Sequence, residues 1–327
     1  MIPPARVALA RGIPYDYPAN QSCGRGRITM ETRRLGKTGM MVSVIGFGAS
    51  EIGYQNVAPR TVETLLNSAL DAGLNVIDTA ACYDASEELI GRAIGHRRNE
   101  YYLLTKCGHA KGLTAREWTP GIVAMSLARS LKRMRTDYVD LLQFHSCDAE
   151  TLRDDALIAA LARTREQGLA RAIGYSGDGP AALAAIALGV FDTLQISVNL
   201  ADQEALERAL PEAAARDMGV IAKRPIANAA WLQSRWSIPE YGRPYRRRLR
   251  KLDYPALRGD RAATIGAALR FTLAAPGVHT AIIGTTRPSR WEENAALLKA
   301  GPMPAGEFAA IRARWREVAG DDWVGLR

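Results

Sequence analysis

The sequence contains an aspartate, a tyrosine, a lysine and a histidine that end or follow short apolar runs, where ionisable side chains are unusual. In DTAACYDASEELIG (78–91), Asp78 ends one run and Tyr83 follows it, while Lys106 and His145 end two later runs. Taken alone, Asp78 and Tyr83 are equally compatible with a turn in which the aspartate caps and the tyrosine packs. Because burying such groups is costly unless they are paired, three of them at equivalent strand ends indicate a functional site.

These four residue types together suit proton transfer at an oxygen atom. A tyrosine phenol has an ordinary pKa of about 10, and a nearby ammonium group lowers it toward neutral pH. An aspartate beside the lysine would balance its charge, and a histidine would hydrogen-bond a substrate oxygen. Such a site adds a proton to a carbonyl oxygen or removes one from an alcohol. It needs no metal, and the cysteines and histidines show no zinc-ligand spacing.

The elements that must position these residues alternate along the chain. Eight short runs rich in apolar and β-branched residues predict strands at 42–48, 75–80, 101–107, 139–145, 171–177, 193–199, 219–225 and 280–286. Amphipathic patterns between them predict helices at about 60–72, 86–95, 119–135, 154–167, 180–188, 204–217, 262–274 and 289–299. Pro211 lies within one of these patterns, so that helix is expected to start or kink there.

Eight strands alternating with eight helices indicate a single α/β domain folded as a closed parallel (β/α)8 barrel, or TIM barrel. An open doubly wound sheet would carry a GxGxxG turn after its first strand, but GFGASEIG (46–53) lacks the third glycine and no helix is predicted directly after it. Two segments fall outside the repeat: a long loop at 226–260 after the seventh strand, and a C-terminal helix near 306–319. Active sites of such barrels lie at the carboxyl ends of the strands.

The last predicted strand is followed by a candidate anion site. The stretch GTTRPSRWEENAA (284–296) places threonine hydroxyls, backbone N–H groups, Arg287 and Arg290 at the start of a helix, which suits the phosphates of a cofactor. The alternative is ordinary helix capping by Thr286 or Ser289 beside two exposed arginines. The motif alone leaves both interpretations open.

Composition and charge narrow the classes of protein further. The chain has 327 residues, 47% of them hydrophobic and 24% charged, and no run approaches the roughly 18 apolar residues of a membrane span. The four cysteines form no CxxC pair, so reduced thiols and a cytoplasmic location are expected. The net charge of +9 is compatible with a nucleic-acid partner. However, the cluster RPYRRRLRK (243–251) lacks an aromatic RNA-binding signature and is interpreted as a solvated loop or short helix.

The first 29 residues show neither a helical nor a strand period. Ordered patterning begins after Met30, so residues 1–29 are expected to be a flexible extension or to precede the natural start at Met30. Residues 30–327 are then expected to form the barrel.

With these motifs in place, the sequence resembles the aldo-keto reductase superfamily, in its bacterial type. The resemblance runs from about Arg33 to Leu298 and is carried by GLNVIDTAACYDASEELIGRAI, LLTKCG, DYVDLLQFHS, AIGYSG and IIGTTRPSRWEEN. It implies a (β/α)8 barrel that uses NADPH, or less often NADH, without a Rossmann domain. The implied reaction is reduction of an aldehyde or ketone to an alcohol, or its reverse, as in a sugar dehydrogenase.

The resemblance also implies a role for each of the four site residues. Tyr83 would be the general acid/base, Lys106 would lower its pKa, and Asp78 would pair with Lys106. His145 would orient the substrate carbonyl. Cys82, beside the tyrosine, is interpreted as a small filler residue in preference to a nucleophile.

At the nicotinamide end of the cofactor, the resemblance implies that Ser176 and Gln195 hold the carboxamide. Gly177 stands where the family often has asparagine, which removes one side-chain hydrogen bond. Lys223 or Arg224 replaces an aromatic residue that commonly stacks on the nicotinamide ring, and an arginine plane offers an alternative stacking surface.

At the other end, Arg290, Glu293 and Asn294 match contacts to the adenine. A lysine often found near the 2′-phosphate is Gly284 here, and Arg287 and Arg290 are expected to compensate, so NADPH is preferred over NADH. The residues predicted to bind this end of the cofactor are Gly284, Thr285, Arg287, Arg290, Glu293 and Asn294.

An NADPH-binding regulatory or sensor subunit with little turnover is the alternative, as in channel-associated members of the superfamily. The departures at 177, 223 and 284 would suit it, whereas the complete set of four site residues favours an enzyme. The expected partner is a small carbonyl or alcohol substrate, with no nucleic acid and no membrane, and monomer and homo-oligomer stay open. Aromatic residues of 226–260 would line the substrate pocket or pack in the core: Trp231, Trp236, Tyr241 and Tyr245.

Overall fold

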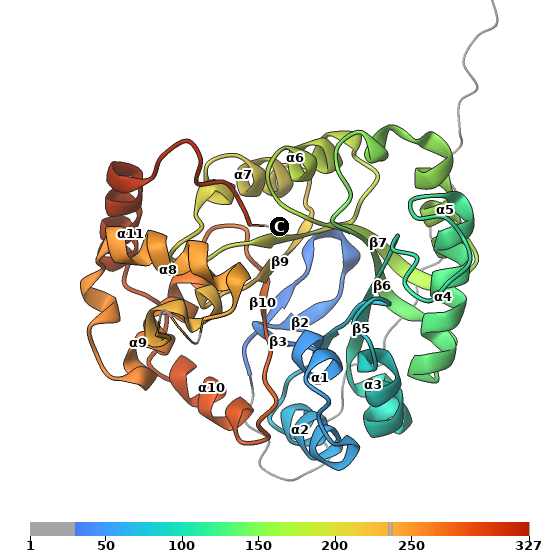
Figure 1. Ribbon diagram of the computed structural model, residues 1–327, viewed down its shortest axis with the longest axis horizontal. Coiled ribbons are helices and arrows are strands. Elements are labelled where there is room, and N and C mark those ends of the chain that lie inside the picture. Colours follow the sequence, from blue (N-terminus) through green and yellow to red (C-terminus); the bar gives the residue numbers. More distant parts are fainter. Residues whose placement is uncertain (1–29, 235, 237, 327) are drawn as a thin grey trace, which may run out of the picture.

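The structure is a computed structural model that describes residues 30–234, 236 and 238–326. The two expectations for residues 1–29 therefore lie outside the described residues. Within them, eight parallel strands close into one barrel with helices around it (Figure 1), which confirms the predicted (β/α)8 fold. None of the helices in these residues is long and apolar enough to cross a membrane.

The barrel strands follow one another around the barrel in chain order, and the last pairs with the first. They are β3 Ile45–Gly48, β4 Val76–Asp78, β5 Tyr102–Cys107, β6 Val139–His145, β7 Ala170–Ser176, β8 Thr193–Ser197, β9 Gly219–Lys223 and β10 Thr280–Ile283. The helices are α1 Ser50–Tyr54, α2 Pro59–Asp71, α3 Ser86–Ile94, α4 Pro120–Met134, α5 Asp155–Glu166, α6 Gly179–Leu188, α7 Ala209–Ala214, α8 Arg243–Leu252, α9 Arg261–Ala274, α10 Arg290–Leu298 and α11 Ala305–Val318.

The start of the barrel differs from its prediction. The predicted strand 42–48 is two strands, because β2 Met41–Ser43 pairs antiparallel with β1 Thr32–Arg34 and only β3 enters the barrel. The Ser43 hydroxyl donates to the Ile45 carbonyl oxygen (2.8 Å) at the break between them. Helix α1 follows β3 almost at once, contrary to the prediction, since its five residues are too few to show a helical period.

The segment after β9 also differs from the long loop that was expected. The basic cluster is the helix α8, and its buried residues are Tyr245, Arg248, Leu249 and Leu252. It packs with α11, the predicted extra C-terminal helix, around a second hydrophobic cluster. In α7, Pro211 is the third helical residue, where the lack of an N–H costs no intrahelical bond.

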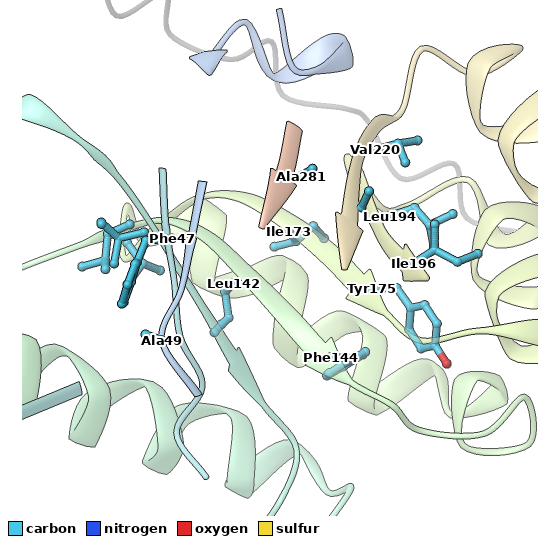
Figure 2. Packing of buried hydrophobic residues seen from close by; sticks show 14 of the residues in the cluster. Phe47, Ala49, Leu142, Phe144, Ile173, Tyr175, Leu194, Ile196, Val220 and Ala281 are labelled. Atoms are coloured by element: carbon cyan, nitrogen blue, oxygen red, sulfur yellow. The ribbon is translucent and has the colours of Figure 1, made fainter. Parts of the chain in front are cut away.

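Side chains of the strands alternate between the helices and the barrel interior, because a strand has a period of two. Leu142 and Phe144 of β6 and Ile173 of β7 pack in the outer hydrophobic layer (Figure 2). The intervening residues form a separate apolar cluster inside the barrel, closed at the bottom by the β1–β2 hairpin. Its buried members are Leu35, Met40, Val42, Val76, Leu104, Leu141, Ala172, Ile221 and Ile282.

This alternation also determines what lies above the apolar floor. Two residues beyond Val76, Leu104, Leu141 and Ile221 the chain has aspartate, lysine, glutamine and lysine, and the same parity directs these side chains to the interior. The carboxyl end of the barrel is therefore lined by polar and charged groups over an apolar base.

Truncating the floor should destabilise the barrel. Leu104 is fully buried, so Leu104→Ala is expected to lower the free energy of unfolding by about 2–5 kcal/mol, measured by urea denaturation. Leu188→Ala, at an exposed site at the end of α6, is the control and should change it by less than about 0.5 kcal/mol. Equal losses in the two variants would contradict this description of the interior.

Candidate active site

The four residues predicted to carry the chemistry lie together at the carboxyl-terminal mouth of the barrel. Asp78 ends β4, Lys106 is the next-to-last residue of β5, and His145 ends β6. Tyr83 lies in the short loop between β4 and α3. Asp78 and Lys106 are only 2% exposed, whereas Tyr83 and His145 are half-buried and reach the edge of the site.

A buried ion pair forms the base of the site. Lys106 Nζ donates to Asp78 Oδ2 at 2.7 Å and to the backbone oxygen of Thr79 at 2.9 Å. Removing both charges from water is costly, and the cost is offset only when the pair is close and further hydrogen bonds complete it. The ammonium also lies 5.1 Å from the centroid of the Tyr83 ring, so its charge acts directly on the phenol.

Aromatic rings surround Tyr83 on the open side of the mouth. Its ring centroid lies 5.5 Å from that of His145, edge to face, and 5.6 Å from that of Tyr54 in α1. His109 lies 5.4 Å from His145 and 5.1 Å from Trp118, both measured between ring centroids. Among the planar side chains around Tyr83 and His145, the sequence patterns did not single out Tyr54, His109 or Trp118.

Burial has the largest effect on the Tyr83 phenol, and it raises the pKa above the ordinary value of 10. The charge of Lys106 lowers this pKa in part, while the nearby Asp78 raises it again. The expectation of a lowered Tyr83 pKa is therefore wrong for this structure, because desolvation outweighs the ammonium. At neutral pH the group is a protonated phenol, which is the form that can donate a proton.

The His145 imidazole is held neutral. Burial, followed by the positive charges of Lys106, His109 and Lys223, lowers the pKa of His145 well below 6.5. A neutral imidazole carries one N–H and one bare nitrogen, so it can donate one hydrogen bond to a substrate oxygen.

Residues predicted to hold the nicotinamide end of a cofactor lie on β7 and β8, next to the strand that carries His145. Ser176 and Gln195 are buried neighbours on β7 and β8, and Gln143 Nε2 donates to Gln195 Oε1 at 3.1 Å. The structure also accounts for Gly177. A Cβ atom there would lie 2.3 Å from the hydroxyl of Tyr175, so the glycine leaves room for that ring.

Lys223 faces the interior but is already paired. Its Nζ lies 2.7 Å from Asp178 Oδ2, and Asp178 Oδ1 accepts from the backbone N–H of Ser197 at 2.7 Å. Burial lowers the pKa of Lys223, and the carboxylate opposes that effect. Asp178 was missed by the sequence analysis, because a lone acid after a strand in YSGDG looks like an ordinary turn residue.

Arg224 holds the C-terminal end of the chain. Its Nη1 donates to Ser197 Oγ at 3.2 Å and to the backbone oxygen of Leu326, and Arg248 Nη2 donates to the backbone oxygen of Val324 at 2.9 Å. The stretch after α11 thus returns to the mouth beside β9 (Figure 1). Lys223 and Arg224 were the two residues predicted to replace an aromatic that stacks on the nicotinamide. Of these, Lys223 is paired with Asp178 inside the barrel, whereas Arg224 contacts the C-terminal stretch.

The loop predicted to bind phosphates carries both signs of charge. Arg290 is paired with Glu293, whose Oε2 also lies 3.8 Å from an Arg287 nitrogen. A Cβ atom at Gly284 would lie 1.9 Å from a carboxylate oxygen of Glu51, so this acid occupies the space beside the glycine. An anion bound here would meet the guanidinium groups of Arg287 and Arg290 and the carboxylates of Glu51 and Glu293.

The same loop makes little use of side-chain capping. Ser289 is the N-cap residue of α10, but its side chain forms no capping hydrogen bond. Thr285 Oγ1 accepts from the backbone N–H of Arg287 at 3.1 Å. The side-chain amide nitrogen of Asn294 is buried and has no hydrogen-bond partner within the described residues. The unpartnered amide of Asn294 suits a ligand with polar oxygens or ring nitrogens, and the start of a helix suits an anion.

The aromatic residues of 226–260 have different locations. Tyr245 is fully buried in the second hydrophobic cluster, and its hydroxyl lies 3.2 Å from Asp202 Oδ2, so it belongs to the core. Trp231 packs at the edge of that cluster. Trp236 is 82% exposed and Tyr241 is also exposed. In the described part of the chain, no group of three or more His, Cys, Asp or Glu is arranged to hold a metal.

Comparison with known proteins defines the class that this fold and site represent. The model of the Aldo/keto reductase family matches residues 44–316, and the chain therefore belongs to this family. It is 29% identical over 289 residues to L-galactose dehydrogenase of Arabidopsis thaliana, covering 82% of this chain and 88% of that protein. It is 27% identical over 311 residues to D-threo-aldose 1-dehydrogenase of a Pseudomonas species, covering 84% and 94% of the two chains.

A solved structure shows the same fold. The holo form of aldo-keto reductase AKR11C1 from Bacillus halodurans has a TM-score of 0.74 and 24% identity, covering 90% of this chain and 99% of that one. The family and the names of the relatives together support an oxidoreductase that acts on carbonyl groups.

Breaking the buried ion pair should destabilise the protein strongly. Asp78→Asn leaves the Lys106 ammonium buried without a counter-charge, and we expect the free energy of unfolding to fall by about 3–5 kcal/mol in urea denaturation. The double variant Asp78→Asn/Lys106→Met should recover part of that loss, because it removes the stranded charge.

The control for this variant is Asp253→Asn, which removes the acid of the exposed pair that Asp253 forms with Arg258. Its effect should be about 0–1 kcal/mol, since exposed ion pairs contribute little. A loss at Asp78 no greater than that at Asp253 would show that the buried pair does not hold the site together.

Proposed function

We propose that this chain is an NAD(P)H-dependent oxidoreductase that reduces an aldehyde or ketone to an alcohol, or catalyses the reverse reaction, with Tyr83 as general acid/base. The observation that carries the proposal is the buried pair of Lys106 and Asp78 placed against Tyr83, with His145 beside them, in an aldo/keto reductase barrel. These groups supply a proton donor, a charge that stabilises the phenolate, and a neutral hydrogen-bond donor.

In the reducing direction, Tyr83 donates its proton to the carbonyl oxygen as that oxygen becomes negatively charged. Its raised pKa keeps it protonated at neutral pH, and the Lys106 ammonium, itself anchored by Asp78, stabilises the phenolate that results. His145, neutral because its pKa is lowered, donates a hydrogen bond to the same oxygen and orients it. In the oxidising direction, the phenolate takes the proton back from the alcohol.

The residues present suit a nicotinamide cofactor, which supplies the hydride for the carbonyl carbon when bound. Ser176 and Gln195 would hold the carboxamide, and the unpartnered Asn294 amide and the arginines Arg287 and Arg290 would hold the adenosine end. Lys223 offers no ring for stacking and would contribute a charge instead. We favour NADPH over NADH because two arginines stand in the loop, although Glu51 weakens that preference.

The second candidate function is a nucleotide sensor with little turnover, and one observation favours it. The Lys223–Asp178 pair fills part of the interior where this family would place an aromatic surface for the nicotinamide. Such a change would alter how the nicotinamide ring is held while leaving the adenosine end unchanged. The two functions differ in turnover and not in binding.

A titration followed by an activity screen separates these functions. NADPH and NADH are added to the purified protein while cofactor fluorescence is followed, and aldehydes, ketones and aldoses are then added to the same cuvette. Aldoses belong in the screen because two relatives are named as sugar dehydrogenases. Oxidation of the bound cofactor by one substrate class supports the enzyme. Tight binding without turnover supports the sensor, and no binding of either cofactor refutes both.

Removing the Tyr83 hydroxyl should abolish turnover and leave the cofactor site intact. We expect Tyr83→Phe to lower kcat by about 10²–10⁴-fold with the dissociation constant for NADPH within about twofold of that of the unaltered chain. Tyr138→Phe is the matched control, because it removes a hydroxyl from a ring that directly precedes β6, at the end of the barrel opposite the mouth. A Tyr83→Phe variant as active as the Tyr138→Phe variant would exclude the acid/base role.

Removing the negative charge beside the phosphate loop should favour the more anionic cofactor. Glu51→Gln is expected to tighten NADPH binding by about threefold to tenfold, because the carboxylate next to Gly284 repels a phosphate. NADH, which lacks the 2′-phosphate, should gain less. An equal gain for both cofactors would place the 2′-phosphate elsewhere, and no gain for either would exclude Glu51 from the phosphate site.

A further inference from the structure

One ring nitrogen of His145 lies against a thiol that the proposed reaction does not use. Cys82 Sγ is 3.3 Å from His145 Nδ1, within hydrogen-bonding distance for sulfur. Cys82 directly precedes Tyr83 in the chain, and both Cys82 and His145 are half-buried. The contact joins the loop after β4 to the end of β6.

The loop holds the thiol in place through its backbone. The Ala81 N–H donates to the Lys106 carbonyl oxygen at 3.1 Å, and the Tyr83 N–H donates to the Ala80 carbonyl oxygen at 3.0 Å. The Cys82 carbonyl oxygen accepts from the hydroxyl of Tyr54 at 3.4 Å. Three backbone groups around Cys82 are therefore hydrogen-bonded, and they hold in place the stretch of backbone that carries the thiol.

The protonation states of both partners follow from their surroundings. Burial, followed by the positive charge of Lys106 and by the nearby His109 and Lys223, lowers the pKa of His145, so the imidazole is neutral and carries a single proton. Burial raises the pKa of the Cys82 thiol, so the sulfur carries a proton as well. The Cys82 S–H and the single N–H of His145 therefore have to share the contact between Sγ and Nδ1, and only one of them can be the donor there.

Two arrangements are available, and they differ in what His145 offers to a substrate. If Nδ1 carried the proton, it would donate to sulfur, which is a weak acceptor, and Nε2 would be a bare lone pair. If the thiol donates to Nδ1, a good acceptor is satisfied and Nε2 keeps the proton. Only the second arrangement leaves an N–H that can donate to a carbonyl oxygen.

We propose that Cys82 is a positioning residue that donates its S–H to Nδ1 of His145 and so holds the imidazole in the tautomer with the proton on Nε2. The inference rests on the proposed function, because that tautomer donates to the carbonyl oxygen that Tyr83 protonates. Cys82 acts through His145 and does not contact the reacting atoms. It is therefore more than a small filler residue, yet it is no nucleophile.

The tautomer is measured directly by long-range ¹H–¹⁵N NMR of the histidine rings in uniformly ¹⁵N-labelled protein, with His145→Gln used to assign the His145 signals. His279 is an internal reference, because the backbone N–H of Val220 donates to His279 Nδ1 at 3.0 Å and fixes the proton on its Nε2. We expect His145 to show the same pattern as His279. A proton on Nδ1 of His145 would overturn the proposal.

Three variants test what the thiol contributes. Cys82→Ser keeps an O–H donor and should keep the tautomer and a kcat/KM within about twofold of that of the unaltered chain. Cys82→Ala and Cys82→Val both remove the S–H donor. Alanine leaves the space of the sulfur atom empty, whereas valine fills it with a methyl group. Both should shift His145 toward a tautomer mixture and lower kcat/KM by about threefold to tenfold. The proposal would be overturned if the alanine and valine variants kept the tautomer unchanged. It would also be overturned if kcat/KM of the serine variant fell as far as theirs.

The two readouts separate this inference from the function on which it rests. One possible result is that His145 carries its proton on Nε2 but none of the tested substrates leads to oxidation of NADPH. In that case the tautomer assignment is supported and the proposed enzyme fails. If the chain is active and the tautomer is unaffected by loss of the thiol, the enzyme stands and the role of Cys82 is refuted. Thermal unfolding of each variant identifies any that has lost its fold. If either Cys82→Ala or Cys82→Val has done so, the other one tests the role of the thiol.

Discussion

A buried pair of opposite charges inside the barrel is the interaction on which the rest of the site depends. Lys106 and Asp78 are almost inaccessible to water and lie on adjacent strands, joined by a 2.7 Å hydrogen bond. Because two such charges are costly to bury, they persist only while β4 and β5 keep their register and Thr79 completes the set of acceptors. That requirement fixes the end of β4, and with it the loop that carries Cys82 and Tyr83.

The barrel provides this environment by layering. Apolar residues from alternate strand positions close the floor, and the next inward positions are polar, so charged groups sit above a base that water does not reach. The same desolvation raises the pKa of Tyr83 and lowers that of His145, so the phenol is protonated and the imidazole is neutral, as the proposed carbonyl reduction requires. Lys223 and Asp178 form a second buried pair, at the end of the site where we propose that the nicotinamide binds.

The sequence predicted the barrel, and it predicted that the four candidate residues meet at its mouth, because both follow from local rules. Apolar runs that alternate with amphipathic helices predict parallel strands, and ionisable residues at the ends of those strands stand out in the sequence.

The features that the sequence did not predict depend on contacts between residues that are far apart in the chain. The buried face of α8, the partner of Lys223 and the contact between Cys82 and His145 all need the closed fold. The direction of the Tyr83 pKa was wrong for the same reason, since burial cannot be inferred from a loop sequence.

The pH dependence of kcat/KM for carbonyl reduction tests the central claim most directly, namely that a buried neutral tyrosine donates the proton. The pKa of Tyr83 lies above 10 and that of His145 lies well below 6.5, so neither group titrates between them. The account predicts a flat profile from pH 7 to pH 9, with the decline on the alkaline side only beyond pH 10. A decline centred between pH 7 and pH 9 would show that the proton donor titrates in that range, which would contradict a Tyr83 whose pKa is raised by burial.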